Sequence, residues 1–342
     1  MAGDRYTKLR SRRTDPVIKA SGINEVYERL AEDTAVKYAV GAMQPIDPLY
    51  TQNTIAEGDR VRNQLRDGLS AVGMAAEFCY QGSVTSDTHI RAHSDVDLLT
   101  LHTAFYALEP PLPVTFPYFG DPLSDLKKLR RTAVDVLKKA FPAVTVDDSK
   151  GKAIALSGGS LRREIDVVIA NWWNTVQYQA TGAEHERGIE VYDAKAEQRI
   201  ENKPFLHNRR IAERDMASSG SLRKMIRLLK SLKYDADPAV DLSSYDIASI
   251  AYRMPDDLLR VPAGGELILV RNAEVFLRRL LENPLDRFLL MVPNEMRRVF
   301  ADGHATEAGL RQLHREVTDL VRDIELGLQR SFRKLAEARL FY

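Results

Sequence analysis

Apolar side chains recur at helical spacing ahead of a series of short apolar runs typical of strands. Val61, Leu65, Leu69 and Val72 predict a helix over residues 57–76. Short apolar runs bounded by turn residues predict strands after it. The expected strands are residues 78–81, 94–101, 144–146, 153–156 and 164–170.

Two connections between these strands have a clear signature. The Pro-rich residues 110–117 predict a loop. Residues 125–141 follow it as an amphipathic helix, with Ser124 as the expected N-cap. The turn residues of Ser157-Gly158-Gly159-Ser160 predict a hairpin that leads into the strand at 164–170.

The pattern becomes mainly helical beyond Pro204. The expected helices are residues 209–216, 222–234, 245–252, 267–282 and 307–340. We therefore expect an α+β fold in two domains. Residues 1–203 form a mixed core that starts with a polar arm over about residues 1–20 and an N-terminal helical segment, and residues 204–342 form a helical domain.

The composition adds few constraints. Apolar residues make up 44% and charged residues 28% of the 342 residues, as in ordinary globular proteins. A formal net charge of +1 attracts no polyanion, and the single Cys79 excludes a cysteine-based zinc site within one chain. No apolar run of about 18 residues or more predicts a membrane span. The N-terminus lacks the apolar core of a secretory signal, so we expect a cytoplasmic protein without a membrane partner.

The most informative chemistry lies where the first strand ends and the second begins. Gln81, Gly82 and Ser83 end the first strand, and Asp95 and Asp97 open the second. Glycine lets a backbone approach a phosphate closely, and free amides and a hydroxyl at a turn hydrogen-bond phosphate oxygens. The segment therefore predicts contact with the phosphates of a nucleoside triphosphate.

The carboxylates predict a metal site. Asp166 lies in a matching strand-like run, and three carboxylates at one place repel by roughly 1 kcal/mol per pair in water at about 4 Å. Oxygen ligands suit two Mg²⁺ or Mn²⁺ ions, of which one activates the attacking hydroxyl and the other holds the triphosphate. A lone Asp-x-Asp is more often an exposed strand face, but its apolar flanks, the Gly82-Ser83 turn and Asp166 favour catalysis. Glu164 is a weaker alternative ligand.

A basic stripe follows the turn at Ser218–Ser221. Arg223, Arg227 and Lys230 lie on one face of the helix at 222–234, and no acid of that helix pairs with them. A solvated face is the ordinary interpretation, but aligned cations favour a phosphate. At the next helix, Ser244 and Tyr245 could hold a phosphate and stack a base, or serve as a cap and a core residue.

The chain resembles the DNA polymerase β-like nucleotidyltransferases in Gly82-Ser83, Asp95-x-Asp97 and Asp166. Within that superfamily, Arg227-Leu228-Leu229-Lys230 and Ser244-Tyr245 resemble the branch of oligoadenylate synthetase, cyclic GMP-AMP synthase and the bacterial CD-NTases. The segments at 188–193 and 204–208 also resemble bacterial CD-NTases. The likeness covers about residues 55–260.

The resemblance implies a polymerase β-like core, a helical second lobe and an active site in the cleft between them. It implies that Gly82-Ser83 contacts donor phosphates, that the three aspartates hold Mg²⁺, and that Lys230 with Arg227 contacts the triphosphate. Ser244 matches a phosphate-contacting position and Tyr245 a base-stacking one. Asp87 departs from the pattern, because many relatives have glycine there.

The leading hypothesis is a synthase that condenses ATP- or GTP-type substrates into a cyclic oligonucleotide, a second messenger of the anti-phage CBASS system. The alternatives are a template-independent polymerase or terminal nucleotidyltransferase acting on RNA or protein, and a binding protein without turnover. Expected partners are the nucleotide substrates and regulatory or effector proteins of the same system. A nucleic-acid activator is not indicated, although Lys8, Arg10, Arg12 and Arg13 could form a basic arm.

Overall fold

The structure is a computed structural model that describes residues 2–13, 33–90 and 95–339. These described residues fold into two compact units. The sheet unit comprises Ile46–Asp87 and Ser94–Arg210, and the helical unit comprises Met1–Pro45, Thr88–His93 and Ile211–Tyr342. Each unit has its own apolar core.

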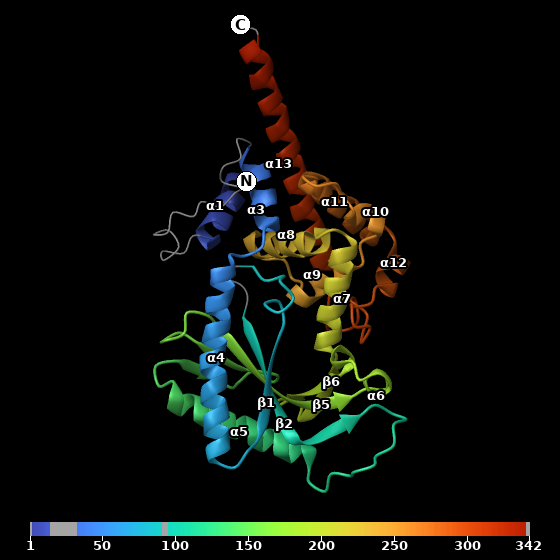
Figure 1. Cartoon of the computed structure of the whole chain (residues 1–342). Coiled ribbons are helices and arrows are strands. Elements are labelled where there is room, and N and C mark those ends of the chain that lie inside the picture. Colours follow the sequence, from blue (N-terminus) through green and yellow to red (C-terminus); the bar gives the residue numbers. More distant parts are fainter. Residues whose placement is uncertain (1, 14–32, 91–94, 340–342) are drawn as a thin grey trace. The chain divides into compact units, whose positions relative to one another are not determined.

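A mixed sheet, seven-stranded in the described part of the chain, forms the centre of the sheet unit (Figure 1). Its order is β1-β2-β5-β4-β3; β6 pairs with the later part of β5 and with β7. β2 and β5 are parallel, and the other pairs are antiparallel. The strands are β1 (Ala76–Gln81), β2 (Val96–Leu108), β3 (Thr145–Asp147), β4 (Ile154–Ser157), β5 (Ile165–Asn174), β6 (Gly188–Asp193) and β7 (Gln198–Asn202).

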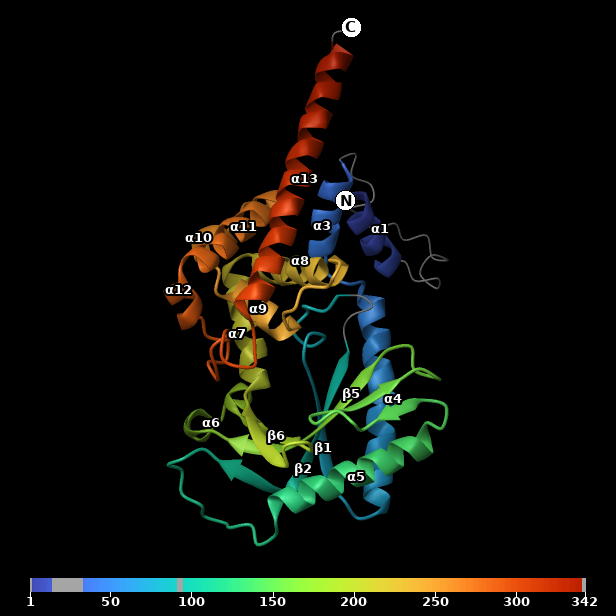
Figure 2. The same ribbon diagram turned by 180° about the vertical axis from the view of Figure 1, so that it is seen from behind.

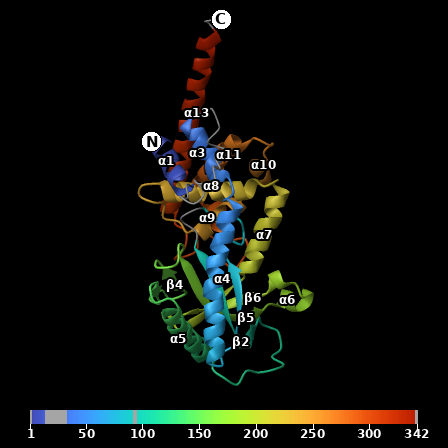
Figure 3. The same ribbon diagram turned by 60° about the vertical axis from the view of Figure 1, so that its left-hand side comes forward.

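Two helices, α4 (Pro48–Ala71) and α5 (Pro122–Ala140), cover one face of this sheet (Figure 3). Their apolar stripes pack with Leu98 and Val167 in the larger core of the unit. The opposite face carries a smaller core that contains Leu99 and Val168. Because side chains alternate along a strand, Asp97 and Asp166 lie on this second face. The short helices α6 (Val176–Thr181) and η2 (Glu184–Glu186) follow β5.

The helical unit is built around α8, whose apolar stripe is fully buried. Leu222, Ile226 and Leu229 pack there at the helical spacing that the sequence predicts. The long helix α13 packs along α11 and α3, and its C-terminal part extends past them (Figure 2). The helices are α1 (Ala2–Arg13), α3 (Thr34–Met43), α7 (Pro204–Ala217, which begins in the sheet unit), α8 (Ser221–Asp235), α9 (Ser244–Tyr252), α10 (Asp256–Leu259), α11 (Glu266–Glu282), α12 (Pro284–Leu289) and α13 (Glu307–Arg339).

The N-terminus differs from the expected polar arm. Residues 2–13 form α1, and Arg12 Nη1 lies 2.6 Å from Oδ1 of the buried Asp235. Lys8 donates to the Asp235 carbonyl at 2.9 Å, and Arg13 donates to the Gln44 carbonyl at 2.7 Å. These cations therefore have partners within the helical unit. The described residues 2–13 and 33–45 group with that unit instead of with the 1–203 core that we expected. The remainder of the expected arm lies outside the described residues.

The first residues of α4 and α5 are set by side chains that cap the helix N-terminus. The Asp121 side chain caps α5 by accepting from the amides of Leu123 and Ser124, so the prediction of Ser124 as the cap is wrong. Asp47 caps α4 in the same way ahead of Pro48, and the helix begins earlier than residue 57. In both helices proline occupies the first turn, where its missing N–H costs nothing. Among the described residues, no helix is long and apolar enough to cross a membrane.

Candidate active site

The sheet register brings the two predicted strand carboxylates together. Asp97 of β2 pairs with Asp166 of β5, and on its other side with Gln81 of β1. Neighbouring strands lie about 4.8 Å apart, so these three side chains form a polar row across one sheet face. The predicted pairing of Asp97 with Asp166 is therefore present in the fold.

Gly82 follows this row and lies against Asp97. Its φ is +81°, and a Cβ built there would lie 2.0 Å from Asp97 Oδ2. Thr85 Oγ1 and Ser86 Oγ donate to the Gly82 carbonyl at 2.9 and 3.2 Å and hold the turn closed around Ser83. Glycine is thus required at residue 82 by its backbone angle and by the space that the carboxylate occupies.

The environment of Asp166 favours a cation. Lys150 Nζ lies 3.6 Å from Asp166 Oδ1. Burial raises the pKa of the Asp166 carboxyl above its ordinary value, although Lys150 acts in the opposite direction. The ionised form of a partly buried carboxylate beside a second carboxylate is stabilised when a positive charge lies close to it. The oxygen donors of Asp97 and Asp166 fit Mg²⁺ or Mn²⁺ better than a softer metal.

Asp95 is not brought into a three-ligand group with them. Within residues 2–13, 33–90 and 95–339, no three His, Cys, Asp or Glu side chains lie close enough to share a metal ion. Asp95 is exposed and precedes β2. Two residues along a strand span about 6–7 Å, so its backbone lies farther from Asp166 than that of Asp97 does.

The basic stripe on α8 is not a solvated face. Arg223 pairs with Asp215 of α7 at 3.0 Å, so an acid outside the helix supplies the partner that the helix itself lacks. Arg227 donates to the Met43 carbonyl and Lys230 to the Thr88 carbonyl, both at 2.9 Å. Arg227 and Lys230 are buried. The prediction that they contact a triphosphate stays a prediction.

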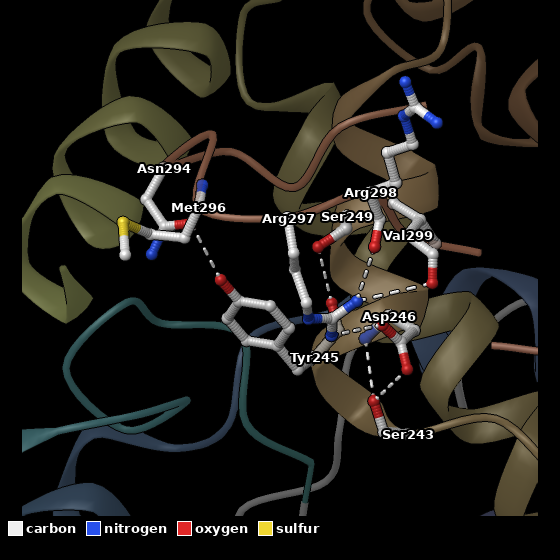
Figure 4. Close-up of polar contacts among 9 residues, drawn as sticks. All are labelled: Ser243, Tyr245, Asp246, Ser249, Asn294, Met296, Arg297, Arg298 and Val299. Carbon is white, nitrogen blue, oxygen red and sulfur yellow. Dashed lines mark hydrogen bonds and ion pairs between the residues drawn. The ribbon is translucent and has the colours of Figure 1, made fainter. Parts of the chain in front are cut away.

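Ser243, not Ser244, caps α9 by accepting from the Asp246 amide at 3.0 Å. Ser244 Oγ lies 3.3 Å from the Tyr234 hydroxyl. The half-buried Tyr245 donates its hydroxyl to Asn294 Oδ1 at 3.1 Å (Figure 4). Burial raises the pKa of Tyr245 to about 12, so the phenol stays neutral at physiological pH.

Several neighbours of these residues could not be predicted from local sequence patterns. Lys150 lies in a polar turn before β4, and only the fold brings it to Asp166. Asn294 and Arg297 lie about fifty residues beyond Tyr245 and reach α9 through tertiary packing. By contrast, Asp87 has a left-handed φ of +52°. Glycine adopts such an angle without strain, which explains why glycine suits this turn position in the family that the sequence resembles.

Comparison with known proteins places the chain in a family. No protein-family model matches the chain. A cyclic dinucleotide synthase, CdnE of Yersinia aleksiciae, is 37% identical over 299 residues, which cover 85% of this chain and 78% of that protein. The chain belongs to the cyclic dinucleotide synthases. It is thus a CD-NTase and a nucleotidyltransferase, as the resemblance implies.

Other members of this family agree. A c-di-GMP synthase of Capnocytophaga granulosa is 34% identical over 241 residues, which cover 64% of this chain and 68% of that protein. The solved structure of a STING-associated CdnE c-di-GMP synthase from Capnocytophaga granulosa covers 95% of this chain and 98% of its own, with a TM-score of 0.76 and 26% identity. The polymerase β-like α+β fold of this CD-NTase is therefore confirmed.

Proposed function

We propose that this CD-NTase joins two nucleoside triphosphates into a cyclic dinucleotide at the row formed by Gln81, Asp97 and Asp166. The observation that carries the proposal is the pairing of Asp97 with Asp166 across parallel strands, with Gly82 fitted against the first carboxylate. Each round of transfer forms a bond between an acceptor hydroxyl oxygen and the donor α-phosphorus. The bond from that phosphorus to the leaving pyrophosphate breaks.

The protein groups have separate tasks in this proposal. Asp97 and Asp166 would hold two Mg²⁺ or Mn²⁺ ions, and Asp95 is proposed to join them although the described residues do not bring the three carboxylates together. Bound divalent ions supply charge neutralisation and a lower pKa of the attacking hydroxyl. The turn at Gly82-Ser83 positions the donor phosphates, because its glycine leaves room beside the carboxylate.

The helical unit supplies the remaining nucleotide contacts in the proposal. Lys230 and Arg227, with Arg223, contact the triphosphate, Ser244 contacts a phosphate, and Tyr245 stacks on a base. The aromatic ring of Tyr245 suits this role, since every base has a π-face on which such a ring stacks. Lys150 balances the charge of Asp166 when no metal is bound.

We propose further that the product is a cytoplasmic second messenger of CBASS-type defence and activates an effector protein. The relatives named c-di-GMP synthases make GTP the first substrate to test. Polymerase or terminal-transferase activity on RNA is less well supported, because Lys8, Arg12 and Arg13 have partners in the helical unit instead of forming an arm.

Product analysis tests the proposal. The full-length protein is incubated with each NTP alone and in pairs, with Mg²⁺ or Mn²⁺, and products are treated with phosphatase before mass determination. A phosphatase-resistant product with the mass of a cyclic dinucleotide is expected. Linear oligonucleotides would replace the proposal with a polymerase.

A further inference from the structure

A short loop of the helical unit contacts α9 in its first turn, at Tyr245. The loop runs over residues 291–299 and is closed on itself by the bridge between Met291 and Arg298. Arg253, at the end of α9, donates to the Met291 carbonyl at 2.7 Å. Both ends of α9 are therefore tied to one loop.

Asn294 holds the outer edge of the Tyr245 ring. Its Oδ1 accepts the Tyr245 hydroxyl at 3.1 Å and the Met296 amide at 3.4 Å (Figure 4). Asn294 is only 3% exposed, so its side chain has little freedom to leave. A buried acceptor of fixed position restricts the rotation of the ring about its own bonds.

Arg297 holds the other side of the same ring. Its guanidinium lies over the Tyr245 ring, 5.3 Å from the centroid. It pairs with the buried Asp246 at 2.7 Å and donates to the carbonyls of Arg298 and Val299 at 2.9 and 3.3 Å. Because these three acceptors hold the Arg297 guanidinium in place, it stays over one face of the Tyr245 ring.

We propose that Asn294 and Arg297 are positioning residues for the nucleotide base. They fix the plane of Tyr245 and cover one of its faces, so that a base stacks on the opposite face of an already oriented ring. This inference rests on the proposed stacking role of Tyr245. A preoriented ring binds the base without the loss of side-chain freedom that a mobile ring would suffer.

The test measures binding of 2-aminopurine riboside triphosphate with Mg²⁺ to the full-length protein, because the fluorescence of this base is quenched when it stacks. Tyr245→Leu is expected to weaken binding about tenfold and to relieve the quenching. Tyr245→Phe and Asn294→Ala are each expected to weaken binding about threefold, with partial relief of the quenching. The double variant Tyr245→Phe/Asn294→Ala is expected to lose about threefold and not ninefold, since both changes remove the same hydrogen bond between the Tyr245 hydroxyl and Asn294.

Three further variants separate positioning from folding. Asn294→Asp keeps an acceptor for the Tyr245 hydroxyl but buries a charge, and it is expected to weaken binding less than Asn294→Ala does. Arg297→Lys, which keeps the charge but not the fork of donors, is expected to relieve quenching in part. Arg298→Gln is the matched control, because Arg298 points away from Tyr245 in the same loop (Figure 4) and is expected to change nothing. Thermal unfolding shows whether each variant is folded.

The outcomes distinguish the two claims. Unchanged binding in Tyr245→Leu would refute the stacking role and with it this inference. Weakened binding in Tyr245→Leu together with full quenching in Tyr245→Phe and Asn294→Ala would refute the positioning role alone. A ninefold loss in the double variant would show that Asn294 acts on the ligand independently, which also contradicts the inference.

Discussion

Replacing Gly82 by alanine should damage catalysis far more than stability. The added Cβ would lie 2.0 Å from Asp97 Oδ2, well inside the 3.4 Å at which ordinary contact begins. The carboxylate must therefore move by more than about 1 Å, and misplacement of a reacting group by that much can cost about 100-fold in rate. The backbone cost of a left-handed alanine is about 1–2 kcal/mol.

Gly73 provides a matched control within the same unit. Its φ is +73°, close to that of Gly82, but a Cβ there meets nothing within 4 Å. Gly73→Ala should thus lower the free energy of unfolding by a similar 1–2 kcal/mol. It should leave the rate of nucleotidyl transfer nearly unchanged, because no carboxylate is displaced.

The assay combines pyrophosphate release with urea unfolding for the parent and both variants. The expected result is a loss of about 100-fold in rate for Gly82→Ala alone, at comparable losses of stability. Equal rates in the two variants would refute the argument that Gly82 makes room for Asp97. A much larger loss of stability in Gly82→Ala would show that the turn serves folding first.

Three other predictions follow from the packing. Burial lowers the pKa of His207 to about 4, whereas a histidine side chain in the unfolded chain has a pKa near 6.5. The free energy of unfolding should therefore be at its full value above about pH 6.5 and lower by about 1.4 kcal/mol at about pH 5.5. Urea unfolding at the two pH values should show a smaller loss in His207→Gln. Arg12→Met leaves the buried Asp235 without its cation and should cost about 3 kcal/mol of unfolding free energy, measured by urea unfolding; an unchanged midpoint would contradict the packing of α1. Asp87 has a φ of +52°, so Asp87→Gly should change the free energy of unfolding by no more than about 1 kcal/mol, whereas Asp87→Val should lower it by about 1–3 kcal/mol. Equal melting temperatures for the two variants would contradict the left-handed turn.

The individual strands that carry the carboxylates could be predicted from local rules, because side chains alternate along a strand. The meeting of Asp97 with Asp166 could not, because it depends on the long-range parallel pairing of β2 with β5. The Gly82 turn was identifiable from its local sequence. Each predicted strand and each predicted helix beyond Pro204 is present, but β2 continues to Leu108 and α7 begins at Pro204. The sequence did not predict β6, β7, α10 or α12.

The parts that were missed depend on tertiary contacts or on a neglected local signal. α1 is polar in sequence, and it is held by pairing of Arg12 with the distant Asp235. The Asp-Pro pairs at 47–48 and 121–122 are N-cap signals that could have set both helix starts correctly. No local pattern predicts that the loop with Asn294 reaches α9.

The most direct test of the account is nucleotidyl transfer by Asp97→Asn and Asp166→Asn with GTP and Mg²⁺ or Mn²⁺. Asp135→Asn is the control, because it makes the same chemical change at an exposed site on α5. The account predicts that both site variants lose cyclic product and pyrophosphate release while they remain folded, and that the control keeps the parent rate. Normal turnover in either Asp97→Asn or Asp166→Asn would contradict the assignment of the active site.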